Sequence, residues 1–226
     1  MTAERERRMA EAIIVYGKSG SGKSRSLLNF GEDEVFLVNT IGKRLPFPKK
    51  FKYELKTDNV ALIMDKLKAM PTKVAVIDDA GYLLTNAFMR GHSKPKAGSS
   101  SFDLYNDIAD SFWRLLAFIK SALPDDVMVY ILMHEETSDY GETKLRTIGK
   151  LLNEKVCIEG MVTICLRCVV KDDRHIFTTQ SDGRDISKSP ECMFPAEIEN
   201  DLKAVDTRIR EYWGLNKGGE ADGAEV

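Results

Sequence analysis

The segment GKSGSGKS at residues 17–24 constrains this chain most, because it matches the pattern GxxxxGK[ST] in full. A short apolar run at residues 12–16 precedes it and predicts a buried strand, while residues 23–30 have helical character. Glycines in such a turn let backbone N–H groups face inward around phosphate oxygens, and the dipole of the following helix favours the same anion. The segment therefore predicts a strand–turn–helix unit that binds phosphate.

Two side chains of this turn have expected roles of their own. Lys23 is expected to reach the β- and γ-phosphates of a nucleotide, and Ser24 is expected to ligate Mg²⁺. The flanking strand and helix disfavour the alternative of a chance Gly/Ser/Lys loop. The sequence shows no guanine-specific NKxD motif, which favours ATP as the nucleotide. The candidate nucleotide-binding residues are Gly17, Lys18, Ser19, Gly20, Ser21, Gly22, Lys23, Ser24 and Arg25.

Two adjacent carboxylates follow a second apolar strand pattern at residues 74–77. Ligands collect at the carboxyl edge of an open α/β sheet, which is where Asp78 and Asp79 are expected to lie. Asp78 is expected to hold the Mg²⁺ directly or through water, so Ser24 and Asp78 are the candidate metal ligands. Asp79 is a candidate for orienting or deprotonating the attacking water, and its alternative role is the N-cap of a following helix.

His134 ends a third apolar run, at residues 127–133, and is expected near the γ-phosphate. There it would report hydrolysis to the polar segment 135–143, and its alternative is a satisfied polar group at a strand end. Glu135 and Glu136 are alternative water-orienting residues. Together these patterns make Lys23, Asp78, Asp79 and His134 the candidate catalytic residues.

The order of strand and helix patterns predicts the fold class. Expected strands lie at 12–16, 35–38, 74–77 and 127–133, and expected helices at 23–30, 58–70, 82–90, 102–122, 144–155 and 195–213. Their alternation predicts an α/β fold with a mainly parallel sheet and helices on both faces. Residues 161–170 and 174–179 predict a C-terminal antiparallel hairpin. We expect one domain at 1–214 and a disordered acidic tail at 215–226.

Composition excludes several classes of protein. Apolar residues make up 43% of the 226 residues, and the net charge of −2 argues against a strongly basic nucleic-acid coat protein. No apolar run approaches the length of a membrane span, and we expect a cytoplasmic protein with reduced cysteines. Cys165 and Cys168 form a CxxC, with His175 and Cys192 as further zinc candidates. Because residues three apart on a strand face opposite sides, buried structural thiols are favoured.

Four segments together resemble a known family. GKSGSGKS, VAVIDDA, ILMHEE and TTQSDGRDISKSP are similar to the phage-encoded nucleotide-binding P-loop proteins of the RecA-like class, over residues 12–213. These are core-only relatives of the RecA recombinases, often grouped with phage single-strand annealing functions. The resemblance implies a RecA-like P-loop NTPase fold, ATP-dependent binding of single-stranded DNA in recombination or replication, and homo-oligomeric rings or filaments. It also implies an annealing or single-strand-binding protein as partner, and the host cytoplasm as location.

The resemblance further implies a basic residue supplied by a neighbouring subunit. Related hexameric helicases carry Lys-x-Arg on a late strand, whereas this chain has Lys188 followed by Ser-Pro. Arg184, Lys144 and Arg146 are the possible substitutes. The catalytic Glu that many RecA-like proteins carry after the second strand is not evident, because Asn39 and Thr40 follow the strand expected at 35–38. Hydrolysis is therefore expected to be slow, to be stimulated by DNA, or to rely on Asp79.

Two basic segments are candidate DNA contacts. In the first, aromatic residues Phe47, Phe51 and Tyr53 alternate with cations, which suits base stacking combined with phosphate contact. The second lies in the Gly/Ser-rich loop 91–101. A solvated surface is the alternative for both segments, and the alternative for Phe47 and Phe51 is to cover the edge of the core. The candidate DNA-binding residues are Lys43, Arg44, Lys49, Lys50, Lys52, Arg90, Lys94 and Lys96.

Two other functions fit the same turn. One is a non-catalytic, nucleotide-gated module that binds a phage partner, which the absent Arg and Glu favour. The other is a small-molecule kinase, which would need a lid of arginines over the phosphates. The loop at 91–101 offers no arginine cluster for such a lid.

Overall fold

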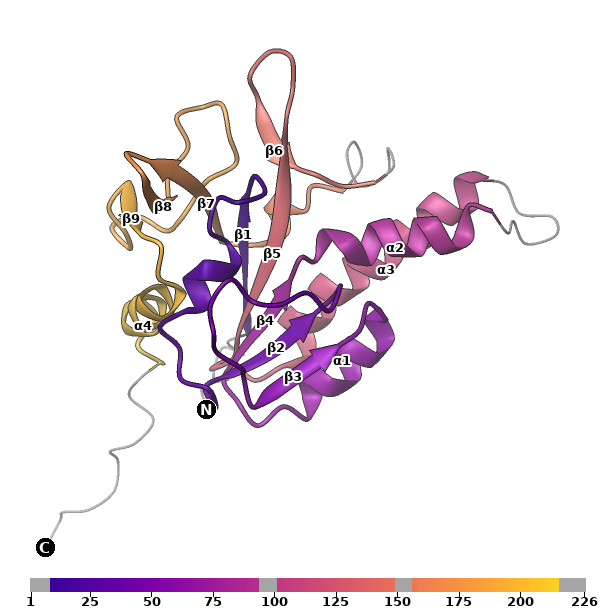
Figure 1. Cartoon of the computed structure of the whole chain (residues 1–226), viewed down its shortest axis with the longest axis horizontal. Coiled ribbons are helices and arrows are strands. Elements are labelled where there is room, and N and C mark those ends of the chain that lie inside the picture. The colour runs from indigo at the N-terminus through magenta and orange to yellow at the C-terminus, as the bar shows by residue number, and fades with distance from the viewer. Residues whose placement is uncertain (1–8, 94–100, 149–155, 216–226) are drawn as a thin grey trace, which may run out of the picture.

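The computed structural model describes residues 9–93, 101–148 and 156–215. In this part of the chain a nine-stranded, mostly parallel sheet has the order β3-β2-β4-β5-β1-β7-β8-β9, and β6 pairs with β5 (Figure 1). The strands are β1 Glu11–Gly17, β2 Val35–Asn39, β3 Tyr53–Lys56, β4 Val74–Asp78, β5 Met128–Thr137, β6 Thr143–Leu145, β7 Ile164–Lys171, β8 Arg174–Thr178 and β9 Glu197–Glu199. The helices are η1 Ser24–Leu27, α1 Val60–Lys68, α2 Gly81–Gly91, α3 Ser101–Ala122, η3 Glu159–Met161 and α4 Leu202–Trp213.

The parallel strands bring the candidate residues to one edge of the sheet. β5 lies between β1 and β4, and Gly17 at the end of β1 is paired with His134 of β5. On the other side of β4, Asn39 is paired with Asp78. The predicted mainly parallel α/β sheet is confirmed, and its carboxyl edge places the turn 17–24 beside these residues.

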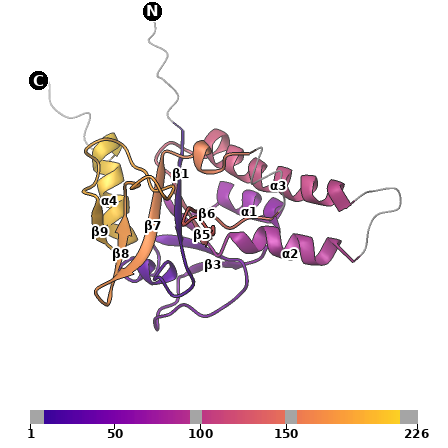
Figure 2. The same ribbon diagram turned by 90° about the horizontal axis from the view of Figure 1, so that it is seen from above.

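Helices cover both faces of the sheet, as the alternation predicted. α1, α2 and α3 pack on one face, whereas η1 and α4 pack on the other (Figure 2). Alternate residues of β1 enter the two cores: Ile14 and Tyr16 face α3, and Ile13 and Val15 face the side of η1 and α4. A strand that is covered on both faces must be apolar throughout, which explains the uninterrupted run at 12–16.

The helix expected at 23–30 is much shorter. Only η1 forms, as a single 3-10 turn, and Leu28 and Phe30 continue it with hydrogen bonds to carbonyls three residues back. Ser26 Oγ donates to the Lys23 carbonyl at 2.5 Å. A serine that donates to a backbone carbonyl in this way competes with the helical bond, and Gly31 follows directly, so the expected helical character is present only as 3-10 turns.

The segment expected as a loop at 135–143 forms a hairpin, which also takes in Lys144 and Leu145 at the start of the helix expected at 144–155. β5 continues to Thr137 and pairs antiparallel with β6. In β6 the side chains of Thr143 and Leu145 are buried and Lys144 is exposed, which is the period of two of a strand. Residues 149–155 lie outside the described part of the chain.

The helix expected at 195–213 begins later, and a strand precedes it. β9 pairs antiparallel with β8, and α4 starts after Asp201, whose side chain accepts hydrogen bonds from the N–H groups of Lys203 and Ala204. Gly214 ends α4 with a φ of 65°. The tail expected at 215–226 lies outside the described residues from 216 onward.

The predicted C-terminal hairpin is confirmed as β7 and β8. Asp172 and Asp173 connect the strands with φ values of 48° and 59°, the left-handed geometry of a two-residue hairpin turn. Cys165 and Cys168 are free, buried thiols on opposite faces of β7, as expected. Among the described residues no three or more His, Cys, Asp or Glu side chains gather where they could hold a metal, and no helix is long and apolar enough to cross a membrane.

Candidate phosphate-binding site

The turn between β1 and η1 is seated tightly on β7 and β8. A Cβ at Gly17 would lie 2.4 Å from the carbonyl oxygen of Cys168. Gly22 has a φ of 104°, and a Cβ there would lie 2.7 Å from Nδ1 of His175. Both positions therefore require glycine, and the β7–β8 hairpin fixes the shape of the turn.

The Lys23 side chain folds back over this turn. Its Nζ donates to the carbonyls of Gly17 and Lys18, both at 2.9 Å, and lies 3.4 Å from His134 Nδ1. Burial lowers the pKa of Lys23, although the nearby Asp79 carboxylate opposes that shift. The ammonium group is thus held at the hollow of the turn, where the predicted role in phosphate binding requires it.

Ser24 and Asp78 meet directly across the site. Ser24 Oγ lies 2.9 Å from Oδ1 and 3.0 Å from Oδ2 of Asp78, to which it donates. Asp78 is fully buried, and burial together with the adjacent Asp79 raises its pKa. A hydroxyl and a carboxylate are the kind of oxygen ligands that Mg²⁺ takes when phosphates and water complete its shell. The two residues therefore fit the expected metal.

Asp79 faces the site rather than capping a helix. The cap position of α2 is Ala80, and no side-chain hydrogen bond caps that helix. Asp79 is buried with a φ of 60°, pairs with Lys43 through Oδ2, and lies with Oδ1 3.3 Å from His134 Nε2. Burial alone would raise its pKa, but the hydrogen bonds from His134 and Lys43 outweigh it and lower the pKa to about 2. So low a pKa suits a residue that orients water better than one that deprotonates it.

These groups surround one cavity of about 260 Å³. It contains most of the predicted phosphate-binding residues, together with Asp79 and His134, while Asp78 lies behind Ser24. It also contains two cations that we had expected on a DNA surface, Lys43 and Arg44. The lining residues are Ser19, Gly20, Gly22, Lys23, Ser24, Arg25, Lys43, Arg44, Pro46, Asp79, His134 and His175.

His175 is a cavity residue whose place the sequence did not predict. Its Nδ1 lies 2.7 Å from the Ser21 carbonyl oxygen. The sequence predicts the β7–β8 hairpin, but no motif indicates that β7 pairs with β1 and brings His175 to the turn. From the sequence His175 was considered only as a zinc candidate.

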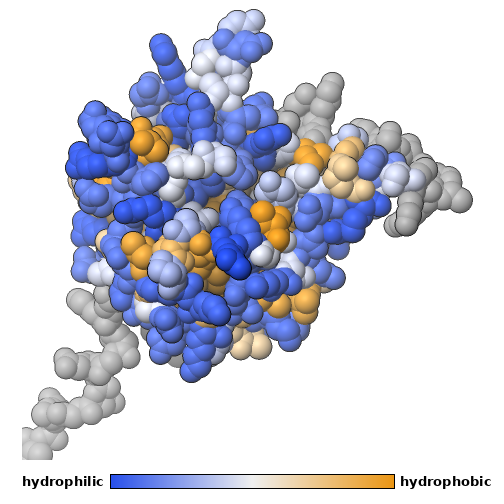
Figure 3. Space-filling view, viewed as in Figure 1, coloured by the Kyte–Doolittle hydropathy of each residue, from blue (hydrophilic) through white to orange (hydrophobic). Residues whose placement is uncertain are grey.

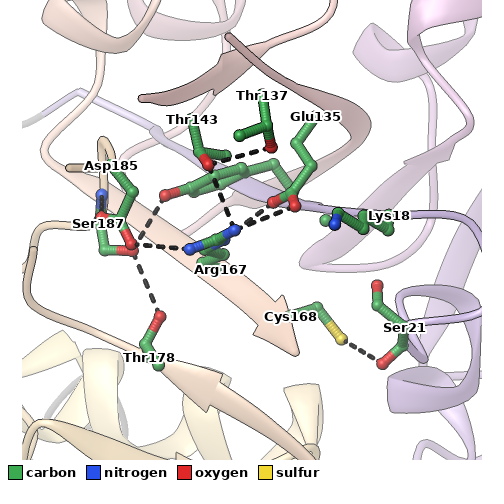
Figure 4. Close-up of polar contacts among 12 residues, drawn as sticks. Lys18, Ser21, Glu135, Thr137, Thr143, Arg167, Cys168, Thr178, Asp185 and Ser187 are labelled. Carbon is green, nitrogen blue, oxygen red and sulfur yellow. Dashed lines mark hydrogen bonds and ion pairs between the residues drawn. The ribbon is translucent and has the colours of Figure 1, made fainter. Parts of the chain in front are cut away.

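Glu135 does not line the cavity and points into a polar cluster around Arg167 (Figure 4). It accepts hydrogen bonds from Arg167 Nε at 2.8 Å and Nη2 at 3.0 Å, and Arg167 Nη1 lies 3.3 Å from Asp185. The hydrogen bonds that Arg167 donates to Glu135 raise the pKa of Arg167. Glu136 lies 3.7 Å from Lys144 on the hairpin. Neither glutamate lines the cavity, and Glu135 ties β5 to β7.

The candidates for a residue acting on a neighbouring subunit lie outside the cavity of their own chain. Lys188 forms a backbone bridge with Cys165 of β7. Lys144, Arg146 and Arg184 are exposed, and the Arg146 N–H donates to the His134 carbonyl at 2.8 Å. Their action in another subunit stays a prediction.

The candidate DNA-binding residues are divided between several surroundings. Lys49 donates to the carbonyls of Leu28 and Phe30, so its ammonium group is engaged within the chain. Phe51 is buried, so its ring is not available to stack on a base. Lys50 and Lys52 are exposed, and Arg90 pairs with Asp58 at 2.6 Å. Lys94 and Lys96 lie outside the described residues. The face drawn in Figure 3 is largely hydrophilic, with small separate apolar groups.

Comparisons with known proteins find a distant structural likeness. No protein-family model matches the sequence, and a comparison with curated proteins finds no match. Among solved structures, a prototypical ATPase from the type III secretion system of pathogenic bacteria is similar, with 15% identity over 73% of this chain and a TM-score of 0.45. This chain spans 53% of that ATPase chain, about half its length. So distant a likeness carries no argument about function, which must come from the site itself.

Proposed function

We propose that this chain binds ATP with Mg²⁺ and hydrolyses it. The observation that carries the proposal is the contact of Ser24 Oγ with Asp78, 2.9 Å long, at the end of a complete phosphate-binding turn. β1 and β4 are not neighbours in the sheet, since β5 lies between them. The fold thus joins two sequence motifs that lie more than fifty residues apart, in the arrangement that a metal-bound triphosphate needs.

Each residue of the site has a defined task in this proposal. The backbone N–H groups of the turn and Lys23 bind the phosphate oxygens, while Ser24 and Asp78 hold the metal. Mg²⁺, when bound, neutralises negative charge that develops on the phosphates. Asp79 orients the attacking water. His134, whose Nε2 lies 3.3 Å from Asp79 Oδ1, responds to the loss of the terminal phosphate. His134 passes that change along β5 to the β5–β6 hairpin.

Phosphate release from ATP in the presence of Mg²⁺ tests the proposal. We expect slow turnover by the wild-type chain and none by Asp78→Asn. Binding without any turnover would favour the nucleotide-gated module instead, which the low pKa of Asp79 as a base keeps as the second candidate. Transfer of the phosphate to a nucleoside would favour the kinase. Absence of nucleotide binding would contradict all three.

We further propose single-stranded DNA as the partner, in phage recombination or replication, and a ring or filament as the assembly. The support is the family resemblance and the exposed cations Arg44, Lys50 and Lys52, which lie in the segment that enters the cavity. We expect salt-sensitive retention of single-stranded DNA on a filter with ATP and Mg²⁺, and a rise in turnover. No retention at low salt, or a monomer under the same conditions, would contradict this part.

A further inference from the structure

We infer that Lys43 binds the terminal phosphate of the nucleotide from within the same chain, and that Asp79 holds Lys43 while that phosphate is absent. The inference rests on the proposed function and adds a phosphate-binding residue to it. It also changes the expectation for Lys43, which the sequence placed among the DNA contacts.

The backbone of Lys43 is fastened to the edge of the sheet. Asn39, the last residue of β2, is buried and donates from Nδ2 to the Lys43 carbonyl at 2.8 Å. Next to it, Thr40 Oγ1 donates to the carbonyls of Asp78 and Asp79 at 2.9 and 3.0 Å. The start of the 40–52 segment is thus bonded to the two residues that end β4 and begin the site, so Lys43 does not reach the cavity by the chance position of a loose loop.

The Lys43 side chain spans the cavity toward the carboxylate. Its Nζ pairs with Asp79 Oδ2, and both residues line the cavity with Lys23 and His134. Burial lowers the pKa of Lys43, but the Asp79 carboxylate and the Asp78 charge outweigh it, so the pKa is raised and the ammonium stays charged. The Lys43 side chain is 41% exposed, which leaves it free to turn from Asp79 toward a ligand.

The charges of the cavity favour a cation beside Asp79 when a triphosphate enters. Lys23 is already bonded to two carbonyls of the turn, and Asp79 contributes a negative charge beside the place expected for the terminal phosphate. An anionic phosphate and this carboxylate repel each other unless a cation lies between them. Lys43 is positioned to balance both, since its ammonium group already lies at the Asp79 carboxylate and a phosphate oxygen is a charged acceptor of the same kind. Its departure also frees one Asp79 oxygen for water.

The alternative is a permanent ion pair in which Lys43 only positions Asp79, and the two roles predict different nucleotide preferences. A residue that binds the terminal phosphate distinguishes a triphosphate from a diphosphate. Asp79 competes with that phosphate, so its neutralisation by Asp79→Asn strengthens triphosphate binding. A permanent pair predicts neither effect.

Calorimetric titration with the non-hydrolysable triphosphate AMP-PNP and with ADP, both with Mg²⁺, separates these roles. We expect Lys43→Ala to weaken AMP-PNP binding about tenfold or more, the scale of a lost bond to a charged group, with ADP affinity within about twofold of wild type. Lys43→Arg should keep most of the preference, and Asp79→Asn should bind AMP-PNP more tightly. Lys66→Ala, at an exposed lysine of α1 that does not line the cavity, is the control and should change neither affinity.

Equal loss of both nucleotides in Lys43→Ala, or loss of neither, overturns the inference and leaves the proposed function intact. Weaker AMP-PNP binding by Asp79→Asn overturns the assignment of Asp79 as the competing group. A wild-type chain that binds neither nucleotide overturns the proposed function and this inference together. Unfolding curves of each variant, compared with wild type, exclude a trivial loss through misfolding.

Discussion

Adjacent aspartates at the end of β4 have opposite electrostatic surroundings. Asp78 is buried with one hydroxyl partner, and its pKa is raised. Asp79 is buried beside Lys43 and His134, and its pKa is lowered to about 2. Two carboxylates with separated pKa values can take separate roles in one site, here metal binding and the positioning of water. Ionisation of Asp78 therefore lowers the stability of the fold, whereas the ion pairs of Asp79 raise it.

We predict that Asp78→Asn raises the free energy of unfolding at pH 7 yet removes Mg²⁺-dependent nucleotide affinity. Because folding raises the pKa of Asp78, the unfolded chain releases this proton more readily, so above the unfolded pKa this carboxyl lowers the stability of the fold. Urea unfolding measures the first effect and nucleotide titration the second. A less stable variant with normal nucleotide affinity would contradict both parts.

For Asp79 the sign is reversed. Its pKa falls from 3.8 to about 2 on folding, so its ion pairs contribute about 2 kcal/mol above pH 4 and lose this as the pH falls from about 4 toward 2. We predict that Asp79→Asn is less stable than wild type at pH 6 and that the difference shrinks through this window. Asparagine tolerates the left-handed φ of 60°, so the backbone is not a second variable. A difference in the free energy of unfolding between wild type and Asp79→Asn that stays constant from pH 6 to 2 would contradict the assignment.

How much of the site the sequence predicted depends on how local each residue's role is. Lys23, Ser24 and Asp78 belong to motifs whose geometry is local, because a strand and the turn after it determine where these side chains lie. Lys43 and His175 carry no such signal. They enter the cavity through a bond from Asn39 and through the pairing of β7 with β1, and both are contacts between distant parts of the chain.

At the scale of elements, the β7–β8 hairpin packs against the phosphate-binding turn. We predict that Gly22→Ala destabilises the fold and weakens nucleotide binding more than a φ effect alone explains, because its Cβ would lie 2.7 Å from His175. Gly141→Ala is the matched control, with a φ of 82° but nothing within 4 Å, and should cost only about 1–2 kcal/mol. Urea unfolding compares the two. Equal losses would show that the contact with His175 does not matter.

The cluster around Glu135 links the β5–β6 hairpin to β7. The Glu135 side chain is 2% exposed and depends on Arg167 for its charge partner. We predict that Arg167→Met costs about 3 kcal/mol, because it leaves a buried charge unpaired, and that adding Glu135→Gln recovers most of this loss. A double-mutant cycle in urea measures the coupling. Additive effects of the two substitutions would contradict a direct ion pair.

The sequence predicted elements well where burial is strong and poorly where strands are short. Apolar runs identified β1, β2, β4, β5 and β7, which are covered on both faces. β3, β6 and β9 are short edge or hairpin strands with alternating charged residues, and only their partners make them strands. The helix expected at 23–30 is reduced to a 3-10 turn, because the hydrogen bond from Ser26 Oγ to the Lys23 carbonyl competes with the helical ones.

At the scale of the whole molecule, the site exists only in the folded sheet. Its residues come from the ends of β1, β4 and β5, from the segment after β2 and from β8, and the order β2-β4-β5-β1 brings these ends to one edge. Three helices on one face and η1 with α4 on the other hold that order through two separate cores (Figure 2). A ligand bound at this edge therefore contacts parts of the chain that are far apart in sequence.

Equilibrium binding of ATP by calorimetry, with and without Mg²⁺, tests whether the turn at 17–24 binds the nucleotide together with its metal. We predict that the wild-type chain binds ATP and that its affinity falls when Mg²⁺ is removed. Lys23→Ala should lower the ATP affinity at least about tenfold, the scale of a charge-assisted bond. A folded Lys23→Ala variant with the affinity of wild type, or a wild-type chain that binds no ATP at millimolar concentration, would contradict it.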